Sequence, residues 1–516
     1  MSSALLRPPA VLAALLVVSA AVTATGESRL VDAARNRDQK AIRALLTERA
    51  DVNGQSEDGT TALLWAAHWN DLETADLLIR AGADVNLANH LRMTPLSLAC
   101  TNRNAALVDR LLTAGANPNT AIATGETPVM TCASAGSADA VRLLVARGAD
   151  VNAREPVQNQ TALMWAAAEG HPDVVRLLIE HRADLQARTK KGFTALHFAA
   201  REGDIESARL LLAAGVDVNI QSQPEVAEKR GSAGEPGYRA GPSRSGGPSY
   251  EASVSAGSTP LLVATVRAQV PLALFLIEQG ADPNAGAAGF TPLHWAAGTW
   301  EGGEANPVFG FSDAMSGIPN RQAKLDLVNA LLAHGADPNA RMSRRPPGFA
   351  AGFTDVVGAT PFLLASATAD VEVMRLLLAK GADAKAVTKA GTTAIMAATG
   401  MNRTIGESAV TEAQALETVK LLLELGVDAK ALAANGENAL FGPSYRGWNT
   451  LLQLLIDQGA DVNAMSKASI TPWLAASGLG DRLGGVLFNP DTAALLVKHG
   501  ADPKLGKPCM AQTKCR

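Results

Sequence analysis

The chain has 516 residues, of which 47% are hydrophobic and 19% are charged, a composition that excludes disorder along the whole length. Its formal charge of -4 arises from 46 Lys and Arg against 50 Asp and Glu. Such a balance gives no strong positive field, so we expect no nucleic-acid partner. Four cysteines cannot form a disulfide scaffold in a chain of this length, and no CxxC pair is present.

Residues 1–24 have the layout of a secretory signal peptide. The single positive charge of Arg7 precedes an apolar run from Ala10 to Val22, and small residues surround Ala24. The alternative is a retained membrane anchor, but the apolar run is short for a membrane span. We expect cleavage near Ala24, no membrane insertion afterwards, and a periplasmic or secreted protein in a compartment where disulfides persist. Low Tyr and Lys contents with a high Ala content suggest a GC-rich bacterial source.

One motif recurs through the rest of the chain with a period of 33 residues. Each copy has a threonine followed by a short run of Leu and Ala, and a Gly-Ala-Asp-x-Asn motif such as 82–86 ends the compact copies. The shared positions define about twelve units, the first of which begins near Ser28. The threonines are Thr61, Thr94, Thr127, Thr161, Thr194, Thr259, Thr291, Thr360, Thr393 and Thr471, with Asn438 at the equivalent place.

Each unit predicts a pair of short helices. The threonine hydroxyl can cap a helix start, and a following proline tolerates the first helical position. The second helix, for example 173–181, has apolar residues at helical spacing. A glycine then permits a left-handed turn; Arg49 and Arg182 replace it at about 1–2 kcal/mol each if that residue is left-handed. One unit cannot bury its own apolar face, so neighbouring units must stack.

The segments TPLHWAA (291–297) and TALHFAA (194–200), with their Gly-Ala-Asp ends, resemble the ankyrin repeat family. The resemblance covers residues 28 to about 504. It implies an all-α solenoid of about twelve helix-turn-helix units with hairpin-like connectors, in which His197 and His294 are structural. It also implies a non-catalytic scaffold for protein–protein interaction. We place units one to six in 26–221, units seven to twelve in 258–504, and a tail in 505–516.

Insertions distinguish this chain from a plain repeat array. Residues 222–257 are rich in Gly, Ser and Pro, which predicts a disordered loop. Two insertions in the second half, 299–323 and 341–357, carry aromatic residues, and we interpret them as a partner contact or a lid. Tolerated length variation is the alternative for all of them, because lengthening a loop costs little free energy. Two smaller insertions are expected at 402–413 and 478–489.

No catalytic motif is present, so we expect no enzyme, no cofactor and no metal site. The Gly-rich stretch 478–485 fails the dinucleotide-binding spacing. His68, His90 and His171 occur singly, which is poor evidence for metal ligation. The alternative function is a subunit of an enzyme complex, or an atypical enzyme, with a site built by the 299–323 and 341–357 loops.

The cysteines fall into two pairs. Cys100 and Cys132 lie on small-residue faces of first helices in consecutive units, and we expect buried free thiols. Cys509 and Cys515 lie in the C-terminal tail with five residues between them. In an oxidising compartment they favour a local disulfide, and the alternative is a link to another chain.

The resemblance places recognition on a concave surface made by the connector tips and the exposed ends of the first helices. Exposed aromatic and Arg side chains are typical interface anchors. Packing on an adjacent unit is the alternative, above all for Phe193 and Phe290. We expect Trp65, Trp165 and Trp295 to be core residues, and a chain that is monomeric on its own and binds a protein partner. The candidate partner-binding residues are His68, Trp69, His90, Met93, Lys190, Lys191, Phe193, Arg201, Phe290 and Trp300.

Overall fold

In the computed structural model, the regular structure of the described residues is helical. One isolated bridge pairs Gln55 with Thr61. The expected signal peptide and the tail cysteines Cys509 and Cys515 lie outside the described residues, as do Trp300 and residues 224–255. The described residues are 29–223, 256–298, 318, 320–344, 356–400, 410–479 and 488–507.

The chain divides into two compact units. The first unit comprises Met1–Asp217 with Ser222–Glu251, and the second comprises Val218–Gln221 with Ala252–Arg516. In the part of the chain that the structure describes, no helix combines the length and the apolarity that a membrane span requires.

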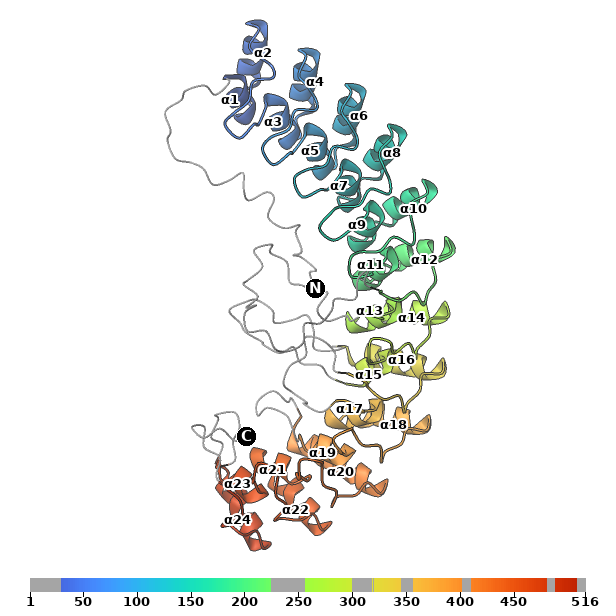
Figure 1. Ribbon diagram of the computed structural model, residues 1–516, viewed down its shortest axis with the longest axis vertical. Helices are drawn as coiled ribbons and strands as arrows, with labels where there is room; N and C mark the ends of the chain where they lie inside the picture. Colours follow the sequence, from blue (N-terminus) through green and yellow to red (C-terminus); the bar gives the residue numbers. More distant parts are fainter. Residues whose placement is uncertain are drawn as a thin grey trace. The chain divides into compact units, whose positions relative to one another are not determined.

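The helices alternate along the chain as the first and second members of pairs (Figure 1). Those of the first unit are α1 (Arg29–Arg35), α2 (Gln39–Thr47), α3 (Ala62–His68), α4 (Leu72–Arg80), α5 (Pro95–Thr101), α6 (Ala105–Thr113), α7 (Pro128–Ser134), α8 (Ala138–Ala146), α9 (Ala162–Ala168), α10 (Pro172–Glu180), α11 (Ala195–Glu202) and α12 (Ile205–Ala213). Those of the second unit are α13 (Pro260–Val266), α14 (Val270–Glu278), α15 (Pro292–Ala297), α16 (Arg321–Ala333), α17 (Pro361–Ala367), α18 (Val371–Ala379), α19 (Ala394–Ala398), α20 (Glu412–Glu424), α21 (Phe441–Arg446), α22 (Asn449–Asp457), α23 (Pro472–Ala476) and α24 (Pro490–Lys498).

Within each unit the first helices form one layer and the second helices form another. In the first unit, α5 packs on α3 and α7, and it also packs on its own partner α6. In the second unit, α17 packs in the same way on α15, α19 and α18. Each helix pair therefore covers the apolar face of its neighbours, as the repeat pattern predicts.

The repeated threonines start the first helices by capping them. The Thr61 hydroxyl accepts a hydrogen bond from the backbone N–H of Leu64 at 3.2 Å, and the Thr94 hydroxyl accepts one from Ser97 at 3.1 Å. Thr127 is an exception, because its hydroxyl forms no capping bond. The predicted role of the threonine in helix initiation is thus confirmed at most of its positions.

The histidine of the repeat motif joins the cap to the connector. His294 is fully buried, and the backbone N–H of Thr291 donates to its Nδ1 at 3.1 Å. Burial lowers the pKa of His294 to about 4, so the ring is neutral at pH 7. Its Nε2 then carries the proton and donates to the carbonyl of Ala340 at 2.9 Å. These bonds give His294 the structural role that the family resemblance implies.

The asparagine that ends the second motif links successive repeats. Asn86 donates to the carbonyl of Gly115 at 3.1 Å, and its side-chain oxygen accepts from the N–H of Asn117 at 2.8 Å. The recurring asparagine is therefore a side-chain staple between neighbouring turns. The same pair of bonds is made by Asn53, Asn119 and Asn152 in the first unit and by Asn284, Asn339 and Asn463 in the second.

The described residues show how the eleventh repeat and two of the expected insertions depart from the regular repeat. In the eleventh predicted repeat, α21 begins at Phe441, three residues after Asn438, and its start has no side-chain cap. The 341–357 insertion enters at a connector tip, since Met342 N–H still donates to the carbonyl of Ala359 at 3.0 Å. By contrast, α16 begins at Arg321, so the last residues of the expected 299–323 insertion are helical.

The turn after each second helix is left-handed. Gly82 has φ +92°, and Arg49 and Arg182 occupy the equivalent place with φ +58° and +62°. A side chain in this region is strained, because its Cβ lies too close to the following carbonyl oxygen. The strain predicted for the two arginines is therefore present.

We predict that Arg182→Gly stabilises the first unit by about 1 kcal/mol, because glycine removes this strain. The exposed Arg182 forms no salt bridge among the described residues, and its carbonyl, which accepts from Asn152, is kept. The midpoint of urea unfolding should rise. His181→Gly is the matched control, since its φ of -94° needs no glycine and its midpoint should not rise. A lower midpoint for Arg182→Gly would contradict the prediction.

Candidate functional site

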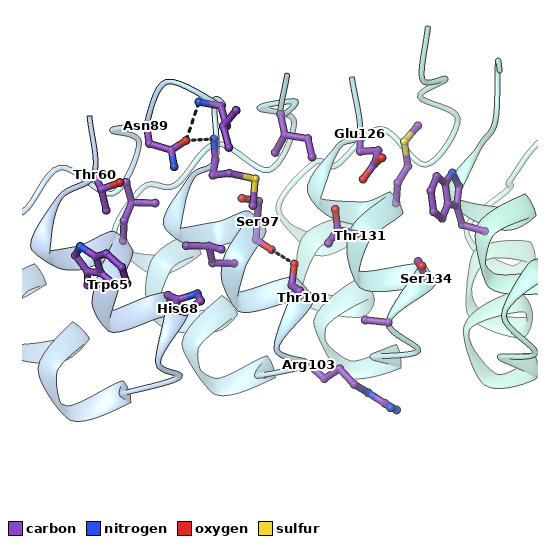
Figure 2. A pocket seen from close by; sticks show the side chains of 18 of the residues that line it. Thr60, Trp65, His68, Asn89, Ser97, Thr101, Arg103, Glu126, Thr131 and Ser134 are labelled. Carbon is purple, nitrogen blue, oxygen red and sulfur yellow. Dashed lines mark hydrogen bonds between the residues drawn. The ribbon is translucent and has the colours of Figure 1, made fainter. Parts of the chain in front are cut away.

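A groove of about 370 Å³ lies across the first helices of the first unit. It is bounded by α3, α5, α7 and α9 and by the connector tips that precede them (Figure 2). We call it the first-unit groove. Its apolar lining includes Leu64, Trp65, Leu91, Met93, Leu98, Ile122, Met130 and Trp165. Its polar lining includes His68, Thr101, Arg103, Glu126, Ser134 and Glu169.

The repeat register explains why the groove lies here. The fourth residue after the shared threonine is a tryptophan in α3 and α9, namely Trp65 and Trp165. The same position is Leu98 in α5 and Thr131 in α7. The two smaller side chains lie between the two large ones along the stacked helices, which leaves a hollow between two indole walls. Trp65 is 9% exposed and Trp165 is half-buried, so both predicted core tryptophans also line the groove.

An aromatic cluster forms one end of the groove. Trp65 and Trp69 are stacked with ring centroids 6.0 Å apart, and His68 lies 4.7 Å from Trp69. Arg35 lies over the Trp65 ring at 5.4 Å from its centroid. Burial lowers the pKa of His68 below its ordinary value, so this ring is neutral at pH 7. The exposed Trp69 indole, which donates to the carbonyl of Arg35 at 3.1 Å, is held as a fixed apolar surface.

Two carboxylates line the part of the groove that α7 and α9 form, one before the start of α7 and one at the end of α9. Glu126 is half-buried below the connector before α7, and Glu169 is exposed at the end of α9. Burial, together with the nearby charge of Glu155, raises the pKa of Glu126 above its ordinary value. The carboxylate of Glu155 accepts backbone N–H bonds within its own connector, from Val157 at 2.6 Å and Gln158 at 2.8 Å. Glu155 therefore holds the connector, whereas Glu126 faces the groove.

Family models for ankyrin repeats match more than half of the chain. A model of three ankyrin copies matches residues 8–89, 81–155 and 154–222, and a single-repeat model matches 288–343 and 357–389. The chain belongs to the ankyrin repeat family. Ankyrin repeats are generally protein–protein interaction modules, and the fold is typically a non-catalytic scaffold. No curated protein to which the chain was compared matches it.

Among solved structures, the chain is similar to the human ASB11 ankyrin repeat domain. The two are 27% identical, over 38% of this chain and 87% of the ASB11 chain, with a TM-score of 0.35.

The first-unit groove contains only some of the predicted partner-binding residues. His68 and Met93 line it, and Trp69 packs on its aromatic end. His90, Lys190 and Lys191 are exposed at connector tips outside the lining. The Lys190 ammonium donates to the carbonyl of Pro156 at 2.6 Å, so this lysine also has a structural contact.

Three aromatic or arginine candidates are held within the fold. Phe193 is half-buried with its ring 5.3 Å from that of His197, and Arg201 lies over the Phe198 ring at 5.0 Å. Phe290 is only 1% exposed and packs in the core of the second unit, 6.0 Å from Trp295. The prediction that Phe290 contacts a partner is corrected, because a buried ring presents no surface.

The groove residues that the sequence analysis missed include Leu91, Leu98, Met130 and Glu126. Their signal was the register, because they lie on the first helices of successive repeats or on the connector tips before them. Within the described ranges, no three His, Cys, Asp or Glu side chains are placed to hold a metal ion together.

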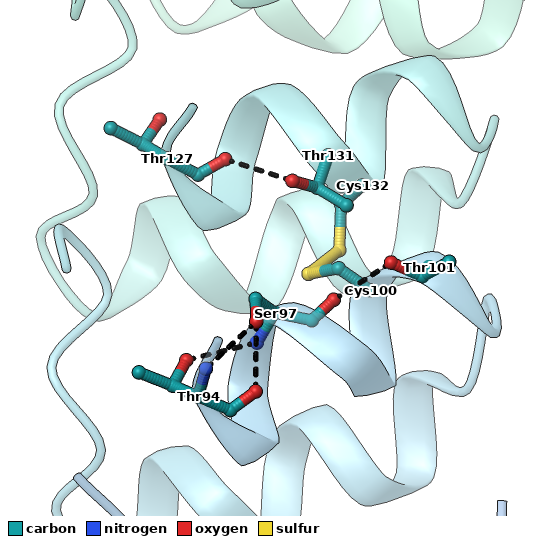
Figure 3. The surroundings of a disulfide bond; sticks show 7 residues. All are labelled: Thr94, Ser97, Cys100, Thr101, Thr127, Thr131 and Cys132. Atoms are coloured by element: carbon teal, nitrogen blue, oxygen red, sulfur yellow. Dashed lines mark hydrogen bonds between the residues drawn. A yellow bond between two sulfur atoms is a disulfide. The ribbon is translucent and has the colours of Figure 1, made fainter. Parts of the chain in front are cut away.

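A disulfide joins two helices of the groove (Figure 3). Cys100 of α5 and Cys132 of α7 are bonded and fully buried, so the prediction of free thiols is wrong. Their sequence separation is 32, one less than the repeat period, which puts them at adjacent positions on facing first helices. Their Cα atoms are 4.5 Å apart, because small residues on this face let the helices approach closely. The separation of 32 residues, one less than the repeat period, was the sequence signal that could have predicted this disulfide.

We predict that the double variant Cys100→Ala/Cys132→Ala lowers the stability of the first unit by about 3–4 kcal/mol. The reason is the loop of roughly 30 residues that the disulfide closes in the unfolded chain. Urea unfolding with and without a reductant measures the effect. Reductant should lower the wild-type midpoint toward that of the variant and leave the variant unchanged. Equal midpoints for oxidised and reduced wild type would contradict the prediction.

Proposed function

We propose that this ankyrin protein is a non-catalytic scaffold that binds a protein partner in the first-unit groove. The observation that carries the proposal is the apolar hollow itself, which lies open across four successive first helices. Leu91 at its rim is 45% exposed, and Trp69 at its aromatic end is 39% exposed. Contiguous exposed apolar surface with aromatic anchors is typical of protein interaction sites.

The composition of the groove supports a protein partner over chemistry. The surface of its lining is mainly apolar, and its polar side chains are spread over separate repeats. No nucleophile in the lining is paired with a general base in the manner of a catalytic site. The alternative site at the 299–323 and 341–357 loops has no observation in its favour among the described residues, which contain little of either loop. We propose that the chain acts as a monomer toward its partner.

The variant Leu91→Asp tests whether the partner binds in the first-unit groove. A buried carboxylate would oppose contact with an apolar partner surface, so we expect retention of the partner to fall by about tenfold or more. The variant should fold normally, because the Leu91 side chain is exposed and its backbone bond from Ala123 is kept. The measurement is quantitative capture of proteins from the native extract, followed by mass spectrometry.

Leu432→Asp is the matched control for this experiment. Leu432 is also an exposed leucine on a connector, at 58%, but it belongs to the second unit. A partner retained by wild type and Leu432→Asp and lost by Leu91→Asp would support the proposal. A partner retained equally by all three chains would contradict the placement in this groove.

We also propose that the protein works outside the cytoplasm, in the periplasm or after secretion. The Cys100–Cys132 disulfide supports this proposal, because buried structural disulfides are rare in reducing cytosol. The signal-like pattern of residues 1–24 agrees with it.

Thiol trapping tests the compartment. In cells that express the chain with Cys509→Ser and Cys515→Ser, acid quenching followed by denaturing alkylation should label neither Cys100 nor Cys132 until a reductant is added. A version lacking residues 1–24 should remain in the cytosol and be labelled at both cysteines directly. Full direct labelling of the version that keeps residues 1–24 would count against export.

A further inference from the structure

The first-unit groove is apolar along its floor and carries two carboxylates at its α7–α9 end, one before the start of α7 and one at the end of α9. Glu126 and Glu169 both line it, and neither forms a salt bridge with a cationic side chain among the described residues. Among the described residues, the only hydrogen bond to the Glu126 carboxylate is a long one of 3.4 Å from the Thr124 hydroxyl. A half-buried carboxylate without a cationic partner carries a desolvation cost, which a bound cation would offset.

The other ionisable groups of the groove do not neutralise this charge. Arg103 lies on the side of the groove opposite Glu126 (Figure 2), with its guanidinium directed to the carbonyl of Gly136 at 3.5 Å. His68 is neutral at pH 7, because burial lowers its pKa. Glu155, behind the Glu126 connector, adds further negative charge. Around Glu126, the charges of the groove lining therefore favour a cation.

An indole wall lies beside the acidic end. Trp165 and Glu169 are four residues apart, on α9 and at its C-terminal cap, and therefore share one face of the helix. A cation placed against that face would meet an aromatic ring and a carboxylate together. Both contacts are favourable for an ammonium or a guanidinium group.

We infer that the first-unit groove takes a peptide segment of its protein partner whose apolar side chains fill the floor and whose Lys or Arg lies at the α7–α9 end of the groove, in the field of Glu126 and Glu169. This inference rests on the proposed binding function and adds the chemistry of the segment. Leu98 and Met130 form the middle of the floor, where Leu- or Phe-sized side chains fit between the two indole walls. The charge then fixes the direction in which the segment lies.

Three fluorescein-labelled peptides test the inference on the full, oxidised chain. They share one frame of Leu, Phe and Ala and differ only in carrying Lys, Gln or Glu at one position. We expect fluorescence anisotropy to give a Kd for the Lys peptide about tenfold lower than that for the Gln peptide, with the Glu peptide weakest. The Lys advantage should shrink as NaCl is raised, because salt screens partly exposed charges.

The variant Glu126→Gln/Glu169→Gln should abolish the preference for Lys over Gln and leave the affinity for the Gln peptide unchanged. Glu180→Gln, which removes an exposed acid at the end of α10 in the same unit, should keep the preference. Circular dichroism should give the same helix content for all three chains.

The outcomes separate this inference from the proposed function. Equal binding of the three peptides that Leu91→Asp weakens would overturn the cation contact and leave the groove as a binding site. No binding of any peptide would overturn the inferred segment, while the capture experiment with Leu91→Asp would still decide the proposed function. Binding of N-acetyl-lysine amide as tight as that of the Lys peptide would overturn the segment in favour of a small-molecule site.

Discussion

Close approach of neighbouring first helices is the constraint on which the rest of the structure depends. Each helix pair is too short to bury its apolar face alone, so it is stable only against its neighbours. The faces that meet carry mostly alanine or cysteine, for example Ala66, Ala99, Cys132 and Ala166, all nearly or fully buried. Larger side chains there would push the helices apart and would separate the asparagine staples between the turns.

This constraint leaves one face of each first helix open to variation. The residues that meet the neighbouring repeats are small, whereas in α3, α5 and α7 the fourth and seventh residues after the shared threonine line the groove. In the first-unit groove that freedom produces tryptophan at both ends, in α3 and α9, and smaller residues in the middle. The hollow is thus a consequence of composition at one repeat position, and it needs no change of backbone. In the second unit, the equivalent Trp295 is fully buried in the core.

The repeat register made the fold predictable from the sequence. The threonine caps, the left-handed turns at Gly82 and Arg182, and the buried histidines all follow from local rules that depend on a few neighbouring residues. The disulfide and the burial of Phe290 depend instead on which residues of different repeats face each other. Whether Cys100 and Cys132 form a disulfide depended on an offset of one residue between their positions on adjacent first helices. The burial of Phe290 depended on residues from several repeats, including Met342 and Val356 near the two ends of the expected 341–357 insertion.

The disulfide and the groove act on the same two helices. Cys100 follows the groove residues Ser97 and Leu98 on α5, and Cys132 follows Met130 and Thr131 on α7. A covalent bond beneath the floor limits relative movement of these helices, so less conformational entropy is lost when a partner binds. Ionised Glu126, by contrast, is costly to keep half-buried without a cation, and it contributes no salt bridge within the described residues. A rigid floor beside an uncompensated charge is the arrangement expected where binding, rather than stability of the free chain, determines the residues.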